Sequence, residues 1–454
     1  MRTLCLALLF LVLPLPAAGP DLIQRFPMEA YQPLGRPWLE ATDSSPLFPE
    51  GVQARKAEDF RVRFLGPWEA DYVAANLTDP VANLETQRVA RLQGEVAKGA
   101  GFGPNFRPYG QAWLDRLKAL LPDHSGRRPF DPGRRAVLLD NTPVRLLPTT
   151  DLFLQSHTLA GQGYPFDDLQ NSALWAGTPV YLLDETRDRA WCKVMGSGVA
   201  GWVRSQNVAL AGPGLVRQWR RAVVREGLVA AIHNEAPIRD RQGRFRGQAF
   251  VGSVFPRSGT GVLFPVRHGH SAGARSVQAA LPGGAGVRQP WVYTPHHAAT
   301  LWQAMLGRPY GWGNINLHND CSSELKNFFT PFGLWLPRHS TDQRDRGRRV
   351  DLAALDVPGR LEALARVGRP YLSLIWFPGH VMLYLGPVAE GRPEAGFMTY
   401  QSLWGLRPKV LPDFRSIVGA SVLFPVLETY PEAPELLSLA ARAGFTVTQL
   451  DEEP

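Results

Sequence analysis

Three residues in the last third of the chain have the types and the order that catalysis by a thiol requires. Cys321 comes first, His380 follows, and Gln401 lies 21 residues beyond the histidine. In such a set a thiolate attacks the substrate carbonyl, an imidazole moves the proton, and a third polar group orients the imidazole. The sequence therefore predicts acyl transfer through Cys321, with His380 as the base and Gln401 as the orienting residue.

Cys321 is expected in the first turn of a helix. Asp320 is a favourable N-cap residue, and Leu325 and Phe328 supply a buried face behind the cysteine. The positive end of the helix dipole favours a thiolate there. The alternative is a buried structural cysteine. The polar neighbours of Cys321 disfavour this alternative: Asn319, Asp320, Ser322 and Ser323.

His380 follows a Pro-Gly turn and begins a strand in which side chains alternate between two faces. His380, Met382 and Tyr384 share one face of this predicted strand. Gln401 lies in the next predicted strand, and its amide oxygen can accept a hydrogen bond from the ring N–H of His380. The alternatives are a surface histidine and an ordinary strand glutamine.

The pattern of elements divides the chain into one processing segment and four domains. A chain of 454 residues is too long for one ordinary core. Helical spacing comes first, short strand-like runs between turn residues follow, and helices with alternating strands close the chain. The predicted units are a signal peptide (1–19), a helical N-terminal stabilising domain (20–130), two strand-rich domains (131–212 and 213–290) and an α+β domain (291–454).

The first 19 residues have the features of an export signal. Arg2 is positive, residues 4–15 form a short apolar run, and Ala17, Ala18 and Gly19 form a small-residue cleavage region. No other stretch approaches the roughly 20 apolar residues of a membrane span. We therefore expect export to the periplasm or cell wall, without stable membrane insertion after the signal is removed. The alternative is an N-terminal anchor that stays attached.

The charge and the cysteine content limit which partners and cofactors can be expected. A net charge of +8, taken as dispersed along the chain, favours solubility over nucleic-acid binding. Outside the signal only Cys192 and Cys321 remain, too few for a disulfide-stapled fold, although they could bridge two domains. No carboxylate accompanies the histidine pairs 268/270 and 296/297 at a metal-ligand spacing. We expect no metal and no other cofactor.

Residues 131–212 resemble a bacterial SH3 (SH3b) domain. The resemblance rests on strand-like runs at 191–194 and 207–210 that flank a Gly-Trp-Val segment at 201–203. A long loop precedes them. Residues 213–290 resemble a second such domain. The resemblance implies two small β-barrels.

The C-terminal motifs resemble those of the NlpC/P60 family of cell-wall cysteine peptidases. This resemblance implies a papain-like α+β catalytic domain that follows a helical stabilising domain and two SH3b domains. Besides a polar third residue, the motifs are Tyr310-x-Trp312-Gly313, Asp320-Cys321-Ser322, Leu336-Pro337-Arg338-x-Ser340 and Gly379-His380-Val381.

The resemblance implies hydrolysis of the γ-D-glutamyl–diaminopimelate bond in peptidoglycan stem peptides or muropeptide fragments, with a preference for those that have a free N-terminal L-Ala. Physical chemistry agrees, since Asp320 can pair with an ammonium and Arg338 can bind a carboxylate bidentately. The alternatives are a helix cap for Asp320, core packing for the aromatic residues and a surface ion pair for Arg338. The implied substrate-binding residues are Tyr310, Trp312, Asp320, Ser322, Arg338 and Ser340.

Two positions depart from the family pattern. Ser323 stands where the family commonly has glycine, and Gln401 stands where it commonly has histidine. Glutamine can orient an imidazole but adds no charge. The second departure therefore affects the expected rate of catalysis more than the predicted class of enzyme.

Three alternatives stay open at this point. The same Cys–His pair serves amidases that cut beside muramic acid, and acyltransferases. A wall-binding protein with an idle catalytic domain is the second alternative. In the third, the barrels act as walls of the cleft that restrict substrate length, with Asp167 and Asp168 as candidate contacts in the long loop.

Overall fold

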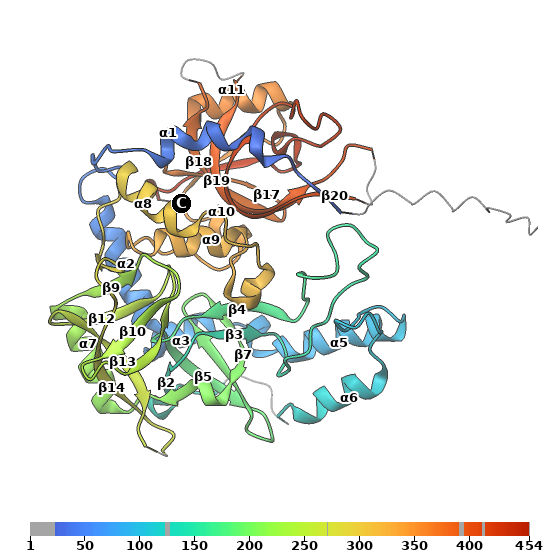
Figure 1. Cartoon of the computed structure of the whole chain (residues 1–454). Coiled ribbons are helices and arrows are strands. Elements are labelled where there is room, and N and C mark those ends of the chain that lie inside the picture. Colours follow the sequence, from blue (N-terminus) through green and yellow to red (C-terminus); the bar gives the residue numbers. More distant parts are fainter. Residues whose placement is uncertain (1–22, 123–127, 270, 390–394, 411–413, 454) are drawn as a thin grey trace, which may run out of the picture.

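The protein is described by a computed structural model that covers residues 23–122, 128–269, 271–389, 395–410 and 414–453. The predicted signal peptide and His270 lie outside these residues. None of the described helices has the length and apolar character to cross a membrane. Three seven-stranded sheets organise the residues that the structure describes. In Figure 1 the C-terminal sheet, coloured orange to red, lies above the other two, with α9 between them.

The C-terminal sheet carries the predicted catalytic strands at its centre. The order is β1 (Ile23–Arg25), β20 (Arg415–Val426), β19 (Phe397–Leu406), β18 (His380–Pro387), β17 (Ser373–Phe377), β21 (Thr446–Gln449) and β16 (Arg348–Asp351). Neighbouring strands are antiparallel except for β1, which pairs parallel with β20. The N-terminal segment therefore completes the C-terminal sheet, which the predicted domain pattern did not include.

Helices cover both faces of this sheet, as the alternation along β18 predicts. Val381, Leu383 and Leu385 pack with the helices α8 (Pro295–Met305) and α9 (Cys321–Phe329). Met382 and Tyr384 pack on the other face, with α11 (Val357–Val367). The short α10 (Ser340–Arg344) follows the Arg-x-Ser motif. Opposite burial of alternate residues fixes the strand register, because a slip of one residue would exchange the two faces.

The second sheet contains the strands predicted for the first SH3-like domain. Its order is β4 (Gln170–Leu174), β3 (Thr142–Arg145), β7 (Val199–Arg204), β6 (Trp191–Gly196), β5 (Pro179–Glu185), β2 (Arg135–Leu138) and β8 (Val208–Leu210). All its pairings are antiparallel. The loop between β3 and β4 extends from residue 146 to residue 169 and reaches the catalytic part of the chain.

The third sheet follows α7 (Pro213–Arg225), whose Trp219 is fully buried. Its order is β11 (Phe245–Ala249), β10 (Ala236–Asp240), β14 (Ala274–Ala280), β13 (Gly261–Arg267), β12 (Val254–Ser258), β9 (Leu228–Ala231) and β15 (Gly286–Gln289). Residues 250–252 form the turn between β11 and β12. The domain boundaries and the number of barrels stay predictions.

Positive charge is concentrated in this part of the chain. Residues 213–290 contain twelve arginines and three acidic residues, a net charge of +9 against +8 for the whole chain. The expectation of dispersed charge is therefore wrong.

The N-terminal region is mostly helical, as predicted. Its helices are α1 (Arg36–Leu39), α2 (Val52–Leu65), α3 (Ala70–Asn76), α4 (Asp79–Ala82), α5 (Leu84–Ala97) and α6 (Gln111–Leu120). The N-cap before α4 is Thr78. α5 and α6 pack on each other and on Leu147, Phe153 and Leu169 of the long loop. Helices and loop therefore share one small core.

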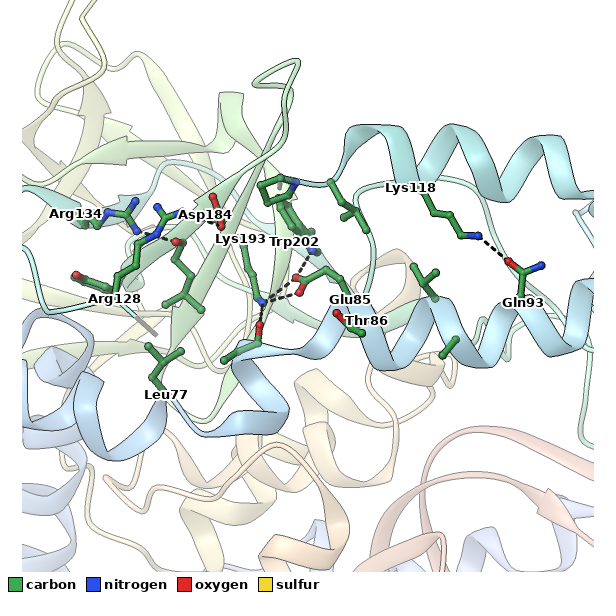
Figure 2. A pocket seen from close by; sticks show the side chains of 17 residues that line it. Leu77, Glu85, Thr86, Gln93, Lys118, Arg128, Arg134, Asp184, Lys193 and Trp202 are labelled. Carbon is green, nitrogen blue, oxygen red and sulfur yellow. Dashed lines mark hydrogen bonds and ion pairs between the residues drawn. The ribbon is translucent and has the colours of Figure 1, made fainter. Parts of the chain in front are cut away.

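A buried ion pair fixes the start of α5 to the SH3-like sheet. Glu85 binds Lys193 at 2.8 Å and accepts a hydrogen bond of 2.8 Å from the indole of Trp202 (Figure 2). Lys193 and Trp202 are directly opposite each other on β6 and β7. A cavity of about 480 Å³ adjoins this contact, and Lys193 and Glu85, two of the charged residues in its lining, pair with each other. We interpret the contact as an anchor.

Loss of this anchor should destabilise the protein. Removing one partner of a buried ion pair leaves the other charge uncompensated and costs about 3–5 kcal/mol. We therefore expect Glu85→Ala to lower the free energy of unfolding by about 3 kcal/mol in urea titrations followed by circular dichroism. Glu40→Ala is the control, because Glu40 pairs with Arg36 on the surface and such pairs contribute below about 1 kcal/mol. Equal effects of the two variants would contradict the anchor.

Candidate active site

Cys321 is the first residue of α9, where the sequence places it. The Asp320 carboxylate accepts a hydrogen bond of 3.0 Å from the backbone N–H of Ser323. The Ser323 hydroxyl in turn lies 2.9 Å from the backbone N–H of Asp320 and accepts from it, which completes a capping box. The departure from glycine at position 323 thus has a structural reason: the serine holds the helix start that carries the cysteine.

His380 and Gln401 form the predicted hydrogen bond. The Nε2 atom of His380 lies 2.6 Å from the Oε1 atom of Gln401. The amide nitrogen of Gln401 donates to the Thr399 hydroxyl at 2.8 Å, which directs the amide oxygen toward the ring. Because this oxygen only accepts, Nε2 carries the proton and Nδ1 is left as the basic nitrogen. The pair is thus arranged for proton transfer at Nδ1.

The start of β18 meets the start of α9. The backbone N–H of Val381, the residue after His380, lies close enough to the Cys321 sulfur to favour its thiolate form. Cys321 and His380 are both buried, with 6% and 8% of their surface exposed. The cysteine and the residues around the base therefore meet in one place, although they are about 60 positions apart in the sequence.

Burial sets the protonation of both residues. Burial, supported by the negative charge of Asp320, raises the pKa of Cys321 to about 12, against the opposing effect of the Val381 N–H. Burial also lowers the pKa of His380 to about 4, although the bond to Gln401 opposes this. At neutral pH the free protein therefore holds Cys321 as a thiol and His380 as a neutral imidazole. The expected preference for a thiolate at the helix start is outweighed by desolvation.

Asp320 and Arg338 bind each other. The guanidinium contacts both carboxylate oxygens, at 3.1 and 2.6 Å, and both side chains are more than 90% buried. Burial alone would raise the pKa of Asp320, but Arg338 and the hydrogen bonds from Ser323 hold it below the usual value. The alternatives left open by the sequence, a helix cap and an ion pair, therefore both describe the free protein, although the pair is buried and not at the surface.

The SH3-like sheet contributes to this ion pair. Ser172 on β4 accepts a 2.9 Å hydrogen bond from Nε of Arg338, and Ser322 accepts one of 2.9 Å from Nη1. Gln170, also on β4, donates to the backbone oxygen of Gly313 at 2.8 Å. The catalytic motif and the SH3-like strand are thereby connected through polar contacts. Sequence analysis missed Gln170 and Ser172, since neither belongs to a catalytic motif.

Aromatic residues form a cluster around Phe166 next to the site. Phe166 of the long loop lies 5.4 Å from Trp312 and 6.2 Å from Tyr310, measured between ring centres. Trp404 lies 5.2 Å from Phe166. Tyr310 is buried, whereas Trp312 is 39% exposed. Tyr310 thus has the core position that was its alternative interpretation, and Trp312 faces the site.

A pocket of about 460 Å³ opens at Cys321 and has walls from three parts of the chain. The catalytic part supplies most of the predicted residues, the SH3-like part supplies four residues, and α5 supplies two arginines. Tyr310 and His380 are not in the lining. The lining residues are Trp312, Gly313, Asp320, Cys321, Ser322, Arg338, His339, Ser340, Thr341 and Gly379; Leu146, Asp168, Gln170 and Asn171; and Arg88 and Arg91.

The two candidate aspartates of the long loop have different positions. Asp168 lines the pocket, where it binds Arg91 at 3.2 Å and Gln155 at 2.8 Å. Asp167 is fully buried in an ion pair with Arg145 and accepts hydrogen bonds from loop backbone N–H groups. Asp167 is therefore a structural residue that holds the loop, and its candidacy as a substrate contact is wrong.

Arg88 and Arg91 were missed because the N-terminal region shows no catalytic motif. They are separated by three positions on α5, a spacing that places two side chains on one face of a helix. This spacing could have indicated that the two arginines act together. It does not show which part of the protein that face of the helix contacts.

Neither a disulfide nor a metal cluster forms in the part of the chain that the structure describes. Cys192 and Cys321 are both free, so the bridge considered from the sequence is wrong. Among the described residues, no group of three His, Cys, Asp or Glu side chains gathers as metal ligands.

Comparisons with known proteins confirm the family resemblance. Residues 152–204 match the family model for the SH3 domain of SH3b1 type. A solved NlpC/P60 endopeptidase from Photobacterium damselae subsp. piscicida is 25% identical, with a TM-score of 0.79 over 91% of this chain and 95% of that one. An NlpC/P60 family protein from Bacillus cereus ATCC 10987 is 14% identical over 68% of this chain and 98% of that one, with a TM-score of 0.42. No curated protein matches the chain. The chain thus has an NlpC/P60 endopeptidase-like fold that includes an SH3b domain.

The neutral state of Cys321 can be tested by alkylation. Because the pKa of the thiol is raised to about 12, the thiolate fraction should grow with pH throughout the neutral range. We expect the rate of iodoacetamide modification to rise about tenfold per pH unit between pH 7 and 10, measured by peptide mass spectrometry. Cys192, with a pKa of about 11, gives a second thiol in the same sample. A rate at Cys321 that is constant from pH 5 to 8 would show a preformed thiolate.

The orienting role of Gln401 can be tested by NMR. Gln401→Leu removes the acceptor at Nε2, so we expect His380 to change from one tautomer to a mixture, seen in its ring ¹⁵N shifts. Gln278→Leu is the control, because this strand glutamine donates to Ser258 in another sheet. Unchanged His380 shifts in Gln401→Leu would refute the assignment.

Proposed function

We propose that the protein is a cysteine endopeptidase that hydrolyses the γ-D-glutamyl–diaminopimelate bond of peptidoglycan stem peptides with a free N-terminal L-Ala. The main support is an arrangement of two elements: Cys321 begins α9 and lines a pocket, and α9 contacts β18, which begins at His380 with its ring bonded to Gln401. The NlpC/P60 endopeptidase-like fold supports the reaction class. The γ-glutamyl bond follows from the motif resemblance.

In the proposed mechanism the Cys321 sulfur attacks the γ-glutamyl carbonyl while Nδ1 of His380 takes the thiol proton. The backbone N–H of Cys321 at the helix start stabilises the tetrahedral oxyanion. The carbon–nitrogen bond then breaks, and His380 gives its proton to the leaving amine of diaminopimelate. A water molecule, deprotonated by His380, hydrolyses the thioester and restores the thiol. Gln401 keeps the second ring nitrogen protonated throughout.

The resting neutral pair is compatible with this sequence of steps. A general base must be unprotonated before attack, and the pKa of His380 near 4 satisfies this condition at all pH values above about 5. The proton moves as the sulfur attacks, so no stable thiolate is needed beforehand. Substrate that displaces water from the pocket leaves the electrostatic contacts of the site stronger.

The pocket favours a short, charged peptide. Its walls include the SH3-like strand β4, so this domain shapes the cleft, as the third alternative from the sequence supposes. Arg88 offers a positive charge to a substrate carboxylate, and the neighbouring Asp168–Arg91 pair adds charges of both signs. We further propose that the protein acts after export, in the periplasm or at the cell wall.

The proposal is tested by incubating L-Ala-γ-D-Glu-diaminopimelate with the protein and with Cys321→Ala. We expect release of diaminopimelate by the parent protein, detected by mass spectrometry, and a loss of at least 10⁴-fold in the variant because the nucleophile is absent. Cleavage between N-acetylmuramic acid and L-Ala in whole peptidoglycan would indicate an amidase instead. Binding to peptidoglycan without turnover by the parent protein would support the wall-binding alternative.

A further inference from the structure

Arg88 is a positively charged residue of the pocket without a partner. It lies on α5, is half-buried and lines the pocket that contains Cys321. Within the described part of the chain, Arg88 forms no hydrogen bond and no ion pair. Arg91 differs, since it binds Glu95 at 2.9 Å and Asp168 at 3.2 Å. Arg88 therefore brings an unused guanidinium to the site.

The surroundings of Arg88 do not neutralise its charge. Burial, together with the positive charge of Arg91, lowers the pKa of Arg88, and the carboxylates of Asp168, Glu95 and Asp167 oppose this only in part. A half-buried guanidinium has lost some of its water without gaining hydrogen bonds in return. A carboxylate that enters the pocket would supply these bonds, in the bidentate geometry that arginine favours.

Arg338, the residue that the sequence assigns to carboxylate binding, already has partners for its guanidinium. Arg338 donates to both oxygens of Asp320 and to the hydroxyls of Ser172 and Ser322. Binding a substrate carboxylate at Arg338 would require breaking this buried pair, which is costly. Arg88 requires no such rearrangement.

The anchor of α5 holds Arg88 in place. Glu85, one helical turn before Arg88, is fixed by Lys193 and Trp202 of the SH3-like sheet (Figure 2). A cation on a fixed helix meets its ligand without first being ordered, so less of the binding energy is lost. The fixed position of Arg88 relative to Cys321 can therefore distinguish substrates by where they carry a carboxylate.

We propose that Arg88 is a specificity-determining residue that binds a free carboxylate of the stem peptide. The inference rests on the proposed function for the identity of the substrate. The tripeptide has three free carboxylates, and two of them stay free when diaminopimelate is itself linked to a following residue: the α-carboxylate of D-Glu and the side-chain carboxylate of diaminopimelate. These two are the candidate ligands. Amidation of one or the other removes its charge, so amidated peptides distinguish the two sources.

The test compares kcat/KM for three substrates: L-Ala-γ-D-Glu-diaminopimelate, the same peptide with the D-Glu carboxylate amidated, and the peptide with the diaminopimelate side chain amidated. We expect one amidation to lower kcat/KM of the parent protein at least tenfold. Arg88→Gln should lower kcat/KM for the unmodified peptide by a similar factor. This variant should then cleave the unmodified peptide and the peptide with the critical carboxylate amidated equally well. Arg88→Lys should restore part of the loss, since it keeps the charge without the bidentate geometry.

Arg116→Gln is the control, because Arg116 is exposed on the neighbouring helix α6 and lies outside the pocket lining. It should leave kcat/KM unchanged for all three substrates. If Arg88→Gln has the activity of the parent protein, or loses the same factor on every substrate, the inference is wrong. Thermal unfolding of each variant verifies that its fold is intact.

Binding separates this inference from the proposed function. In the Cys321→Ala background, calorimetry measures Kd for the same three peptides without turnover. The carboxylate site is supported if Arg88→Gln weakens binding of the unmodified peptide tenfold but does not weaken binding of one of the two amidated peptides. This result supports the site even if the parent protein cleaves none of the peptides. If the parent protein cleaves the peptide normally but neither amidation nor Arg88→Gln changes Kd, the proposed function stands and the carboxylate site at Arg88 is wrong. Absence of binding and of cleavage would overturn both.

Discussion

The Asp320 carboxylate accepts hydrogen bonds from the start of its own helix, from the backbone of Gly313 and from the guanidinium of Arg338. These contacts fix the turn that carries the nucleophile, the segment that carries the exposed tryptophan, and a strand of the SH3-like sheet, which reaches the same guanidinium through Ser172. A charge buried to this extent is stable only while its partners remain. The geometry of the site therefore depends on the packing of two domains, and the SH3-like domain is a structural part of the site.

Burial has a second consequence, on the protonation of the catalytic pair. The same desolvation that keeps water from the cysteine raises its pKa and lowers that of the histidine. The uncharged pair costs less to bury than an ion pair would. Catalysis then requires a base with a fixed free nitrogen, which Gln401 secures without adding a charge. A neutral glutamine at this position is thus consistent with a neutral resting pair.

The N-terminal region links these features to the pocket. Its first strand completes the catalytic sheet, and α5 is attached to the SH3-like sheet by Glu85. From this fixed position the helix presents two arginines to the pocket, one paired with Asp168 and one without a partner. Three segments that are distant in sequence thereby supply the nucleophile, a wall and the positive charge of a single pocket.

The sequence by itself determined the features that depend on neighbouring residues. The helix start at Cys321, the alternation along β18, the SH3-like strands and the His380–Gln401 bond all follow from local backbone geometry and regular spacing. Only the tertiary structure decided that Asp320 and Arg338 bind each other, that Asp167 is buried while Asp168 faces the pocket, and that Arg88 reaches the site. These outcomes depend on contacts between residues far apart in the chain and on the water that those contacts exclude, and no local pattern records either.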